Sequence, residues 1–221
     1  MLGDALSFPR SGDDWMPTLV IGGVLTVLSF LVIPAFILQG YFVRVLRAAA
    51  TGQTGAPSFT DWGGLLVDGL KLFVVNLAYS IVLVVPYFGL LFLIGFGSDG
   101  GAGTGILVLA LGLVVFVLAL VVSYFVPAAS ANFALEGDFG AAFDFGTIKS
   151  AALTSDYAMA WLLALVVGFV GGAVGAALSF LLVGIFVLFY VQVAVYYLFG
   201  RGFAKGLGRT GGDTATTTTT V

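Results

Sequence analysis

The sequence predicts an all-α, polytopic membrane protein, a helix bundle with five membrane spans and two interfacial amphipathic helices. Of its 221 residues, 60% are hydrophobic and only 9% are charged, whereas an ordinary soluble domain has about 25% charged residues. The mean hydropathy is +1.15, so too few polar side chains exist to cover a water-facing surface. Uncharged runs of about 20 residues, the length that crosses a bilayer, recur along the chain.

The five spans follow these uncharged runs. We expect them at residues 17–43, 70–96, 104–131, 157–178 and 180–199, with a turn near Ser179 between the last two. The first run contains Pro34 and allows two interpretations. One long kinked helix places the N-terminus outside, and we favour it. A short hairpin that enters and leaves by the same face adds a sixth helix and places the N-terminus inside.

The positions of the basic residues predict the orientation of the spans. Loops rich in Lys and Arg stay on the cytoplasmic side, and seven of the eight basic residues fall on one face of this threading. Only Arg10 lies opposite if the first span is a single helix, whereas the hairpin gathers all eight. The loop between the second and third spans contains Asp99 and no basic residue. We therefore expect a multi-pass protein of the cell membrane with a cytoplasmic C-terminus.

Two stretches between spans have the pattern of interfacial helices. In residues 58–71, Ser58 and Asp61 resemble a capping box, and apolar residues follow at helical spacing. Residues 139–153 repeat this arrangement. Here we expect three side chains toward lipid and two toward water, namely Phe143, Phe145 and Ile148 against Asp144 and Lys149.

The chain divides into an integral membrane domain, residues 1–203, and a Thr-rich tail, residues 204–221, which we expect to be disordered. The acidic residues are ten Asp and one Glu, and Lys is scarcer than Arg, three against five. This usage resembles that of proteins from salt-loving archaea.

The residue types exclude several kinds of chemistry. Without Cys or His, the chain lacks the usual zinc ligands, thiol nucleophiles and imidazole bases. No ionisable group lies within the expected spans, which disfavours ion-coupled transport. We expect no enzymatic activity, cofactor, metal or nucleic-acid partner. A membrane-embedded enzyme would need four carboxylates to converge with a metal at the inner interface, those of Asp61, Asp68, Asp138 and Asp144.

Two groups of polar residues are candidates for a functional site. The first is basic and is expected to contact lipid headgroups at the inner leaflet, namely Arg44, Arg47, Lys71, Arg201 and Lys205. Lys71 also lies three residues from Asp68, at the spacing of a helical ion pair. The second group is neutral and lies inside the spans, namely Gln39, Asn76 and Gln192. We favour bonds between helices for these amides over the lining of a polar path.

Small residues recur every four positions in the fourth span. They form two ridges, the first through Gly168 and Gly172 and the second through Gly171 and Gly175. Such ridges are typical of close helix packing in membranes.

Three strings resemble a family of multi-pass membrane proteins catalogued as domain of unknown function 4013 and found largely in archaea. They are FPRSGDDWM, GYFVRVLRAAATG and PSFTDWGGLLVDGLKLF, and the resemblance covers residues 6–202. It implies an integral membrane domain of five or six helices with no assigned role. The family supplies no catalytic residues to transfer to this chain.

Two functional hypotheses follow. The first is a non-enzymatic scaffold or accessory subunit that organises lipids or a partner protein. The partner would be a membrane protein, a soluble protein or further copies of this chain in a homo-oligomer. The second is an uncoupled small-solute permease or channel, lined by Asn76, Gln192 and the proline-broken helices.

Overall fold

The computed structural model describes residues 1–96 and 101–209. Helices are the regular elements of these residues, and five of them, α3, α4, α5, α7 and α8, are long and apolar enough to cross a membrane. The all-helical, multi-pass class is thereby confirmed. The main helices are α1 (Leu2–Ser7), α2 (Trp15–Val27), α3 (Val32–Ala50), α4 (Trp62–Phe96), α5 (Gly101–Glu136), α6 (Phe145–Ala152), α7 (Ser155–Leu178) and α8 (Val183–Gly206). Short 3-10 turns are η1 (Phe8–Arg10), η2 (Leu28–Phe30), η3 (Phe139–Phe143) and η4 (Ser179–Leu181).

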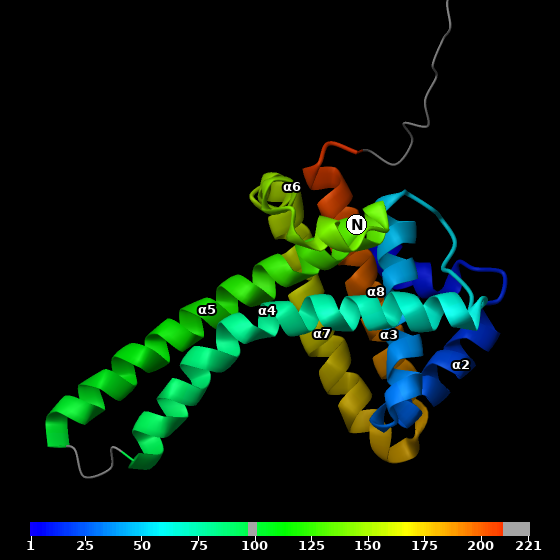
Figure 1. Cartoon of the computed structure of the whole chain (residues 1–221). Coiled ribbons are helices and arrows are strands. Elements are labelled where there is room, and N and C mark those ends of the chain that lie inside the picture. Colours follow the sequence, from blue (N-terminus) through cyan, green and yellow to red (C-terminus); the bar gives the residue numbers. More distant parts are fainter. Residues whose placement is uncertain (97–100, 210–221) are drawn as a thin grey trace, which may run out of the picture.

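The long helices form three hairpins, α2–α3, α4–α5 and α7–α8 (Figure 1). The segments that join one hairpin to the next lie together with both ends of the described chain. A Cβ at Gly12 would be 2.7 Å from the carbonyl oxygen of Ala56, and one at Gly206 would be 2.6 Å from that of Ala151. We call this region, residues 1–14, 51–61, 137–154 and 201–209, the connecting end.

The expectation of a single kinked first span is wrong, because the chain reverses between α2 and α3. Leu31 is extended, with φ −88° and ψ 140°, and separates η2 from α3. The proline is not the cause of the break. Pro34 lies in the first turn of α3, where a residue without an N–H loses no helical hydrogen bond. The hairpin interpretation therefore holds, and the N-terminal segment lies beside α8, where the guanidinium of Arg10 lies 5.9 Å from the ring centroid of Tyr190.

The expected interfacial helix at 58–71 is not a separate element, because α4 begins at Trp62 and continues to Phe96. Its N-terminal cap is Asp61 and not Ser58, since Asp61 Oδ1 accepts a hydrogen bond from the backbone N–H of Gly64 at 3.1 Å. The helix changes direction along its length (Figure 1). Pro86, which lies inside it, removes one backbone donor and accounts for the bend.

Helices α3 and α4 cross at two glycines. A Cβ at Gly40 would lie 1.8 Å from the carbonyl oxygen of Leu65, and a Cβ at Gly69 would lie 1.8 Å from that of Phe36. Only glycine permits two backbones to approach this closely. The crossing positions the first part of α4, which bears Asn76, beside α3, which bears Gln39.

The second expected interfacial segment is split into η3 and α6, each capped by an aspartate. Asp138 accepts from the N–H of Gly140 at 2.9 Å. Asp144 accepts from the hydroxyl of Thr147 at 2.6 Å and from backbone N–H groups, and these bonds lower the pKa of its carboxyl. The assignment of Ile148 to lipid is wrong, because its side chain is 1% exposed and packs in the core. Phe145, Asp144 and Lys149 are exposed as expected, and Phe143 is half-buried.

The turn expected near Ser179 is present, and it begins where α7 ends, at Leu178. Leu182 has a left-handed backbone, φ 59°, and α8 starts one residue later. Phe180, expected to start the fifth span, lies in the turn and is 93% exposed. At the other end α8 continues to Gly206, three residues beyond the expected domain boundary. Asp99 and residues 210–221 of the expected tail lie outside the described residues.

The two expected glycine ridges of α7 have different environments. A Cβ at Gly171 would lie 2.5 Å from Val191 Cγ2, and one at Gly175 would lie 2.6 Å from Leu188 Cδ2. This ridge packs on α8. A Cβ at Gly168 would lie 3.6 Å from Val195 Cγ2, which is an ordinary van der Waals contact. A Cβ at Gly172 would meet nothing within 4 Å. The ridge through Gly168 and Gly172 therefore does not pack closely within the described chain.

Candidate functional site

A polar cavity of about 390 Å³ lies between helices from all three hairpins. Its lining contains the three neutral candidates from three different helices, Gln39 of α3, Asn76 of α4 and Gln192 of α8. Two hydroxyl residues of the first hairpin and several apolar residues complete it, namely Thr26, Ser29, Ala35, Leu38, Phe42, Phe73 and Tyr196. No charged side chain lines this cavity.

Helical spacing explains how these residues come to one place. Positions 35, 38, 39 and 42 lie on one face of α3, and positions 192 and 196 lie one turn apart on α8. Aromatic contacts hold the walls together. Phe42 stacks on Tyr196 at 4.5 Å between ring centroids, and Phe36 meets Phe73 edge-on at 5.3 Å.

The three amide side chains make no hydrogen bond to the described part of the protein, although the sequence favoured bonds between helices. The two hydroxyls bond within their own segment. Thr26 Oγ1 donates to the carbonyl of Gly22 at 2.7 Å, and Ser29 Oγ donates to that of Thr26 at 2.7 Å. Each free amide presents two donors and one acceptor oxygen. The cavity thus offers neutral hydrogen-bonding groups to whatever occupies it.

A second, smaller cavity of about 80 Å³ adjoins the first. The two share Asn76 and Tyr196, and the smaller one is also lined by Leu46, Val126, Pro127, Ser130 and Phe199. Together they follow α8 from Gln192 to Phe199, toward the connecting end. A liquid water molecule takes about 30 Å³, so the smaller cavity has room for a few waters.

Sequence reasoning missed Thr26, Ser29 and Tyr196 as lining residues. The first two belong to the hairpin that a single first span would have straightened. Their spacing of three residues, at the C-terminal end of an apolar helix, was the available signal. The ring of Tyr196 packs on Phe42 beside the cavity.

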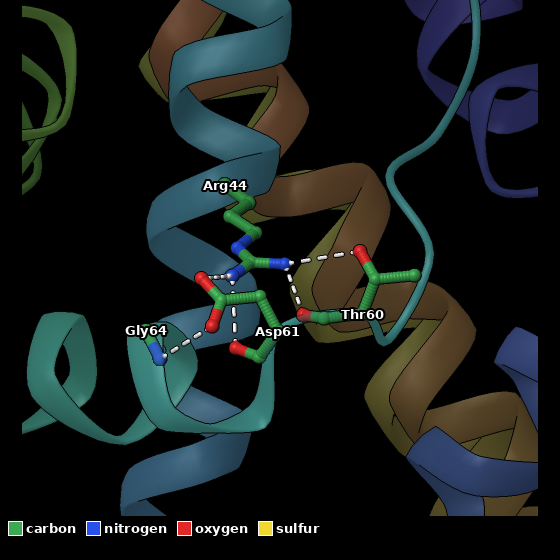
Figure 2. A network of polar contacts seen from close by, with 4 residues as sticks. All are labelled: Arg44, Thr60, Asp61 and Gly64. Carbon is green, nitrogen blue, oxygen red and sulfur yellow. Dashed lines mark hydrogen bonds and ion pairs between the residues drawn. The ribbon is translucent and has the colours of Figure 1, made fainter.

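Two of the basic candidates, Arg44 and Arg47, bind protein groups. Figure 2 shows Arg44 at the start of α4, where it donates to the carbonyl and hydroxyl of Thr60 and to the carbonyl of Asp61. It also forms an ion pair with the Asp61 carboxylate at 3.3 Å. Arg47 Nε donates at 2.7 Å to the carbonyl of Ala134, in the last turn of α5.

Lys71, Arg201 and Lys205 make no ion pair within the described residues, and the expected pair between Asp68 and Lys71 is not formed. The carboxylates that an enzyme would need are also apart. Asp61 binds Arg44, whereas Asp138 and Asp144 cap their own turns. Over residues 1–96 and 101–209, no three potential metal-ligating side chains gather.

Comparison with known proteins identifies one family. A family model described as "Protein of unknown function (DUF4013)" matches residues 27–180. No curated protein and no solved structure matches the chain. The matched range includes Gln39 and Asn76, whereas Gln192 lies beyond it.

Proposed function

The chain belongs to the DUF4013 family. We propose that it is an uncoupled, non-enzymatic permease for a small uncharged polar solute. One observation carries the proposal. Gln39, Asn76 and Gln192 reach one cavity from three helices, and none of their side chains bonds to the described protein.

Unpaired polar groups are costly in a protein surrounded by lipid. Gln39 and Asn76 are half-buried and Gln192 is exposed, and hydrocarbon supplies no hydrogen-bond partner to any of them. Three free amides facing one space are therefore expected to bond to a polar guest or to water. A volume of about 390 Å³ is within the usual range of small-molecule sites, about 300–1,000 Å³.

The absence of charge around the cavity defines the class of solute and of transport. Without a lining cation or carboxylate, an ionic solute would have no counter-charge. Coupling to protons or sodium ordinarily uses an ionisable group inside the membrane. The solute is therefore uncharged, and it moves down its own gradient.

The two adjoining cavities supply a route. Asn76 and Tyr196 line both, so a solute that leaves the larger cavity passes these two side chains on the way toward the connecting end. We propose that this end faces the cytoplasm, because three of its four segments hold basic residues, among them Arg10, Lys149 and Arg201.

Flux into proteoliposomes tests the proposal. We expect the protein to accelerate entry of at least one solute from a panel of water, glycerol, urea and erythritol, and Asn76→Leu and Gln192→Leu to lose that acceleration. Ser80→Ala is the matched control. Ser80 lies one turn from Asn76 on α4, but its hydroxyl donates to the carbonyl of Leu77 and it does not line the cavity.

Two results would contradict the permease. One is entry of every solute at the protein-free rate. The other is unchanged flux in both Leu variants, provided that their melting temperatures in detergent match that of the wild type. A loss in Ser80→Ala of the same size would show that the effect is not specific to the cavity.

The scaffold hypothesis remains as a second candidate because of the outer halves of α4 and α5. They form an arm that extends away from the other hairpins (Figure 1). Large side chains are exposed along it, including Val85, Phe88, Leu109 and Leu113.

Disulfide cross-linking tests the scaffold hypothesis. If the arm joins copies of the chain, Leu109→Cys should form a disulfide dimer in membranes. Phe169→Cys, at an exposed position of α7, is the control.

A further inference from the structure

A separate pocket of about 350 Å³ lies at the connecting end. Three parts of the chain meet there, the N-terminal segment, residues 52–54 and the C-terminal part of α8. Its polar lining includes Ser7, Ser11, Gln53, Thr54 and Arg201. It shares no lining residue with the two cavities of the proposed route.

Arg201 has a buried nitrogen that nothing in the described protein satisfies. Its Nη1 is shielded from solvent and has no hydrogen-bond partner. No carboxylate oxygen lies within ion-pair distance of its guanidinium. A buried guanidinium nitrogen without a partner carries a large desolvation cost, which an anion bound to this guanidinium would offset.

The carboxylate nearest this arginine is already bound. Asp4 also lines the pocket, but its Oδ2 lies 3.0 Å from the amino group of Met1 and its side chain is 69% exposed. Its pKa is lowered mainly by that hydrogen bond to the amino group, and less by the charges of Arg201 and Lys205. Two cations thus act on this region besides the amino group.

We propose that this pocket binds a phosphate-bearing anion through the guanidinium of Arg201. The planar guanidinium donates two parallel hydrogen bonds to phosphate oxygens, which an ammonium group does not. The side chains of Gln53 and Thr54 have no bond to the described protein and add donors at the same pocket. Phe8 packs on Tyr197 at 4.5 Å between ring centroids and forms an apolar wall for the carbon part of the ligand.

The same chemistry is present in an anionic lipid headgroup and in a soluble phosphate ester, so the experiment has two arms. The first measures thermal stabilisation in neutral detergent by inorganic phosphate and by glycerol 1-phosphate, with ionic strength held constant by chloride. The second compares nanodiscs of phosphatidylcholine alone with nanodiscs that contain phosphatidylglycerol. Stabilisation in both arms assigns a general phosphate site, and stabilisation in the second alone assigns the lipid headgroup.

Variants identify the residue responsible. We expect Arg201→Gln to abolish the stabilisation by phosphate. Arg201→Lys keeps the positive charge but cannot donate two parallel hydrogen bonds, so we expect it to weaken binding by about tenfold or more. Arg209→Gln is the matched control, because Arg209 lies at the same end but pairs with Glu136 at 3.5 Å. If Arg201→Gln does not fold, Arg201→Lys and Thr54→Leu, which should also weaken binding, decide the question.

Three results would overturn this proposal. They are wild-type binding in Arg201→Gln, an equal loss in Arg209→Gln, and equal stabilisation by acetate. None of them depends on solute flux, so this site and the permease can fail separately.

Discussion

Two arginines of α3 bind backbone oxygens of other parts of the chain. Arg44 bonds to the carbonyls of Thr60 and Asp61, and Arg47 to that of Ala134. The carbonyl of Ala134, in the last turn of α5, lacks an intrahelical donor, whereas that of Asp61 also accepts from the N–H of Leu65 at 3.0 Å. A guanidinium has five N–H groups in a fixed fork, which is why one side chain satisfies several oxygens of a loop. Arg44 thus fixes where α4 begins (Figure 2).

Arg44→Gln should therefore destabilise the protein. Hydrogen bonds to a charged group are worth about 1.5–3 kcal/mol. Because Asp61 is 74% exposed and solvent screens it, we expect a loss of about 1–2 kcal/mol in the free energy of unfolding. Hydrogen exchange should also become faster in residues 58–64 than elsewhere. Unfolding in mixed micelles and exchange measured by mass spectrometry check the two parts.

Arg209→Gln is the comparison for that prediction. Its ion pair with Glu136 is about half exposed on both sides, 53% and 50%, and such pairs contribute about 0–1 kcal/mol. An equal loss in both variants would mean that the contacts of Arg44 with the loop do not stabilise the start of α4.

At this scale, the sequence shows which polar residues are unusual but not what they contact. Gln39, Asn76 and Gln192 stand out because hydrocarbon penalises polar groups. Gln39 and Asn76 meet because α3 and α4 cross at Gly40 and Gly69, and Gln192 joins them because α8 packs on α3 through Phe42 and Tyr196. Helical periodicity alone contains neither contact. The bonds of Arg44 to Thr60 and Asp61 could not be predicted, because the return of this loop toward α3 is a tertiary contact.

Among elements, the α7–α8 hairpin is the one best predicted. The small residues indicated close packing, and the turn is found where the uncharged run becomes too long for one span. The α2–α3 hairpin was missed because its two arms together have the length of a kinked span. The segment before the second span was wrongly separated, since its apolar periodicity continues unbroken into α4.

Two adjacent glycines of α7 give a sharp test of this packing. Gly171→Ala should cost about 1–3 kcal/mol, because the new methyl group would lie 2.5 Å from Val191 Cγ2, on a β-branched side chain that moves little. Gly172→Ala should be neutral or stabilising by up to about 1 kcal/mol, since alanine favours the helix and meets nothing within 4 Å. Unfolding in one detergent compares them. Equal destabilisation of the two variants would show that both ridges pack closely. The ridge through Gly168 and Gly172 would then pack against another molecule.

For the whole molecule, the decisive feature is the pairing of helices. With three hairpins, every connection between hairpins returns to one end. The N-terminal segment lies there beside residues 52–56 and α8. Arg10, the exception under a single first span, thereby joins the other basic residues. The charge pattern contained this answer, because the hairpin alone gathers all eight.

This pairing predicts which positions share one side of the membrane. The natural chain has no cysteine, so single substitutions can be labelled without interference by a membrane-impermeant maleimide. Ser7→Cys and Leu207→Cys should react from the same side, because both lie at the connecting end. Phe30→Cys and Phe180→Cys lie at the turns of two hairpins, are 77% and 93% exposed in the native residues, and should react only from the other side. One result would contradict this pairing, namely labelling of Ser7→Cys from the same side as Phe180→Cys and not from the side of Leu207→Cys. The first hairpin would then be a single crossing of the membrane, and the basic residues would not lie on one side.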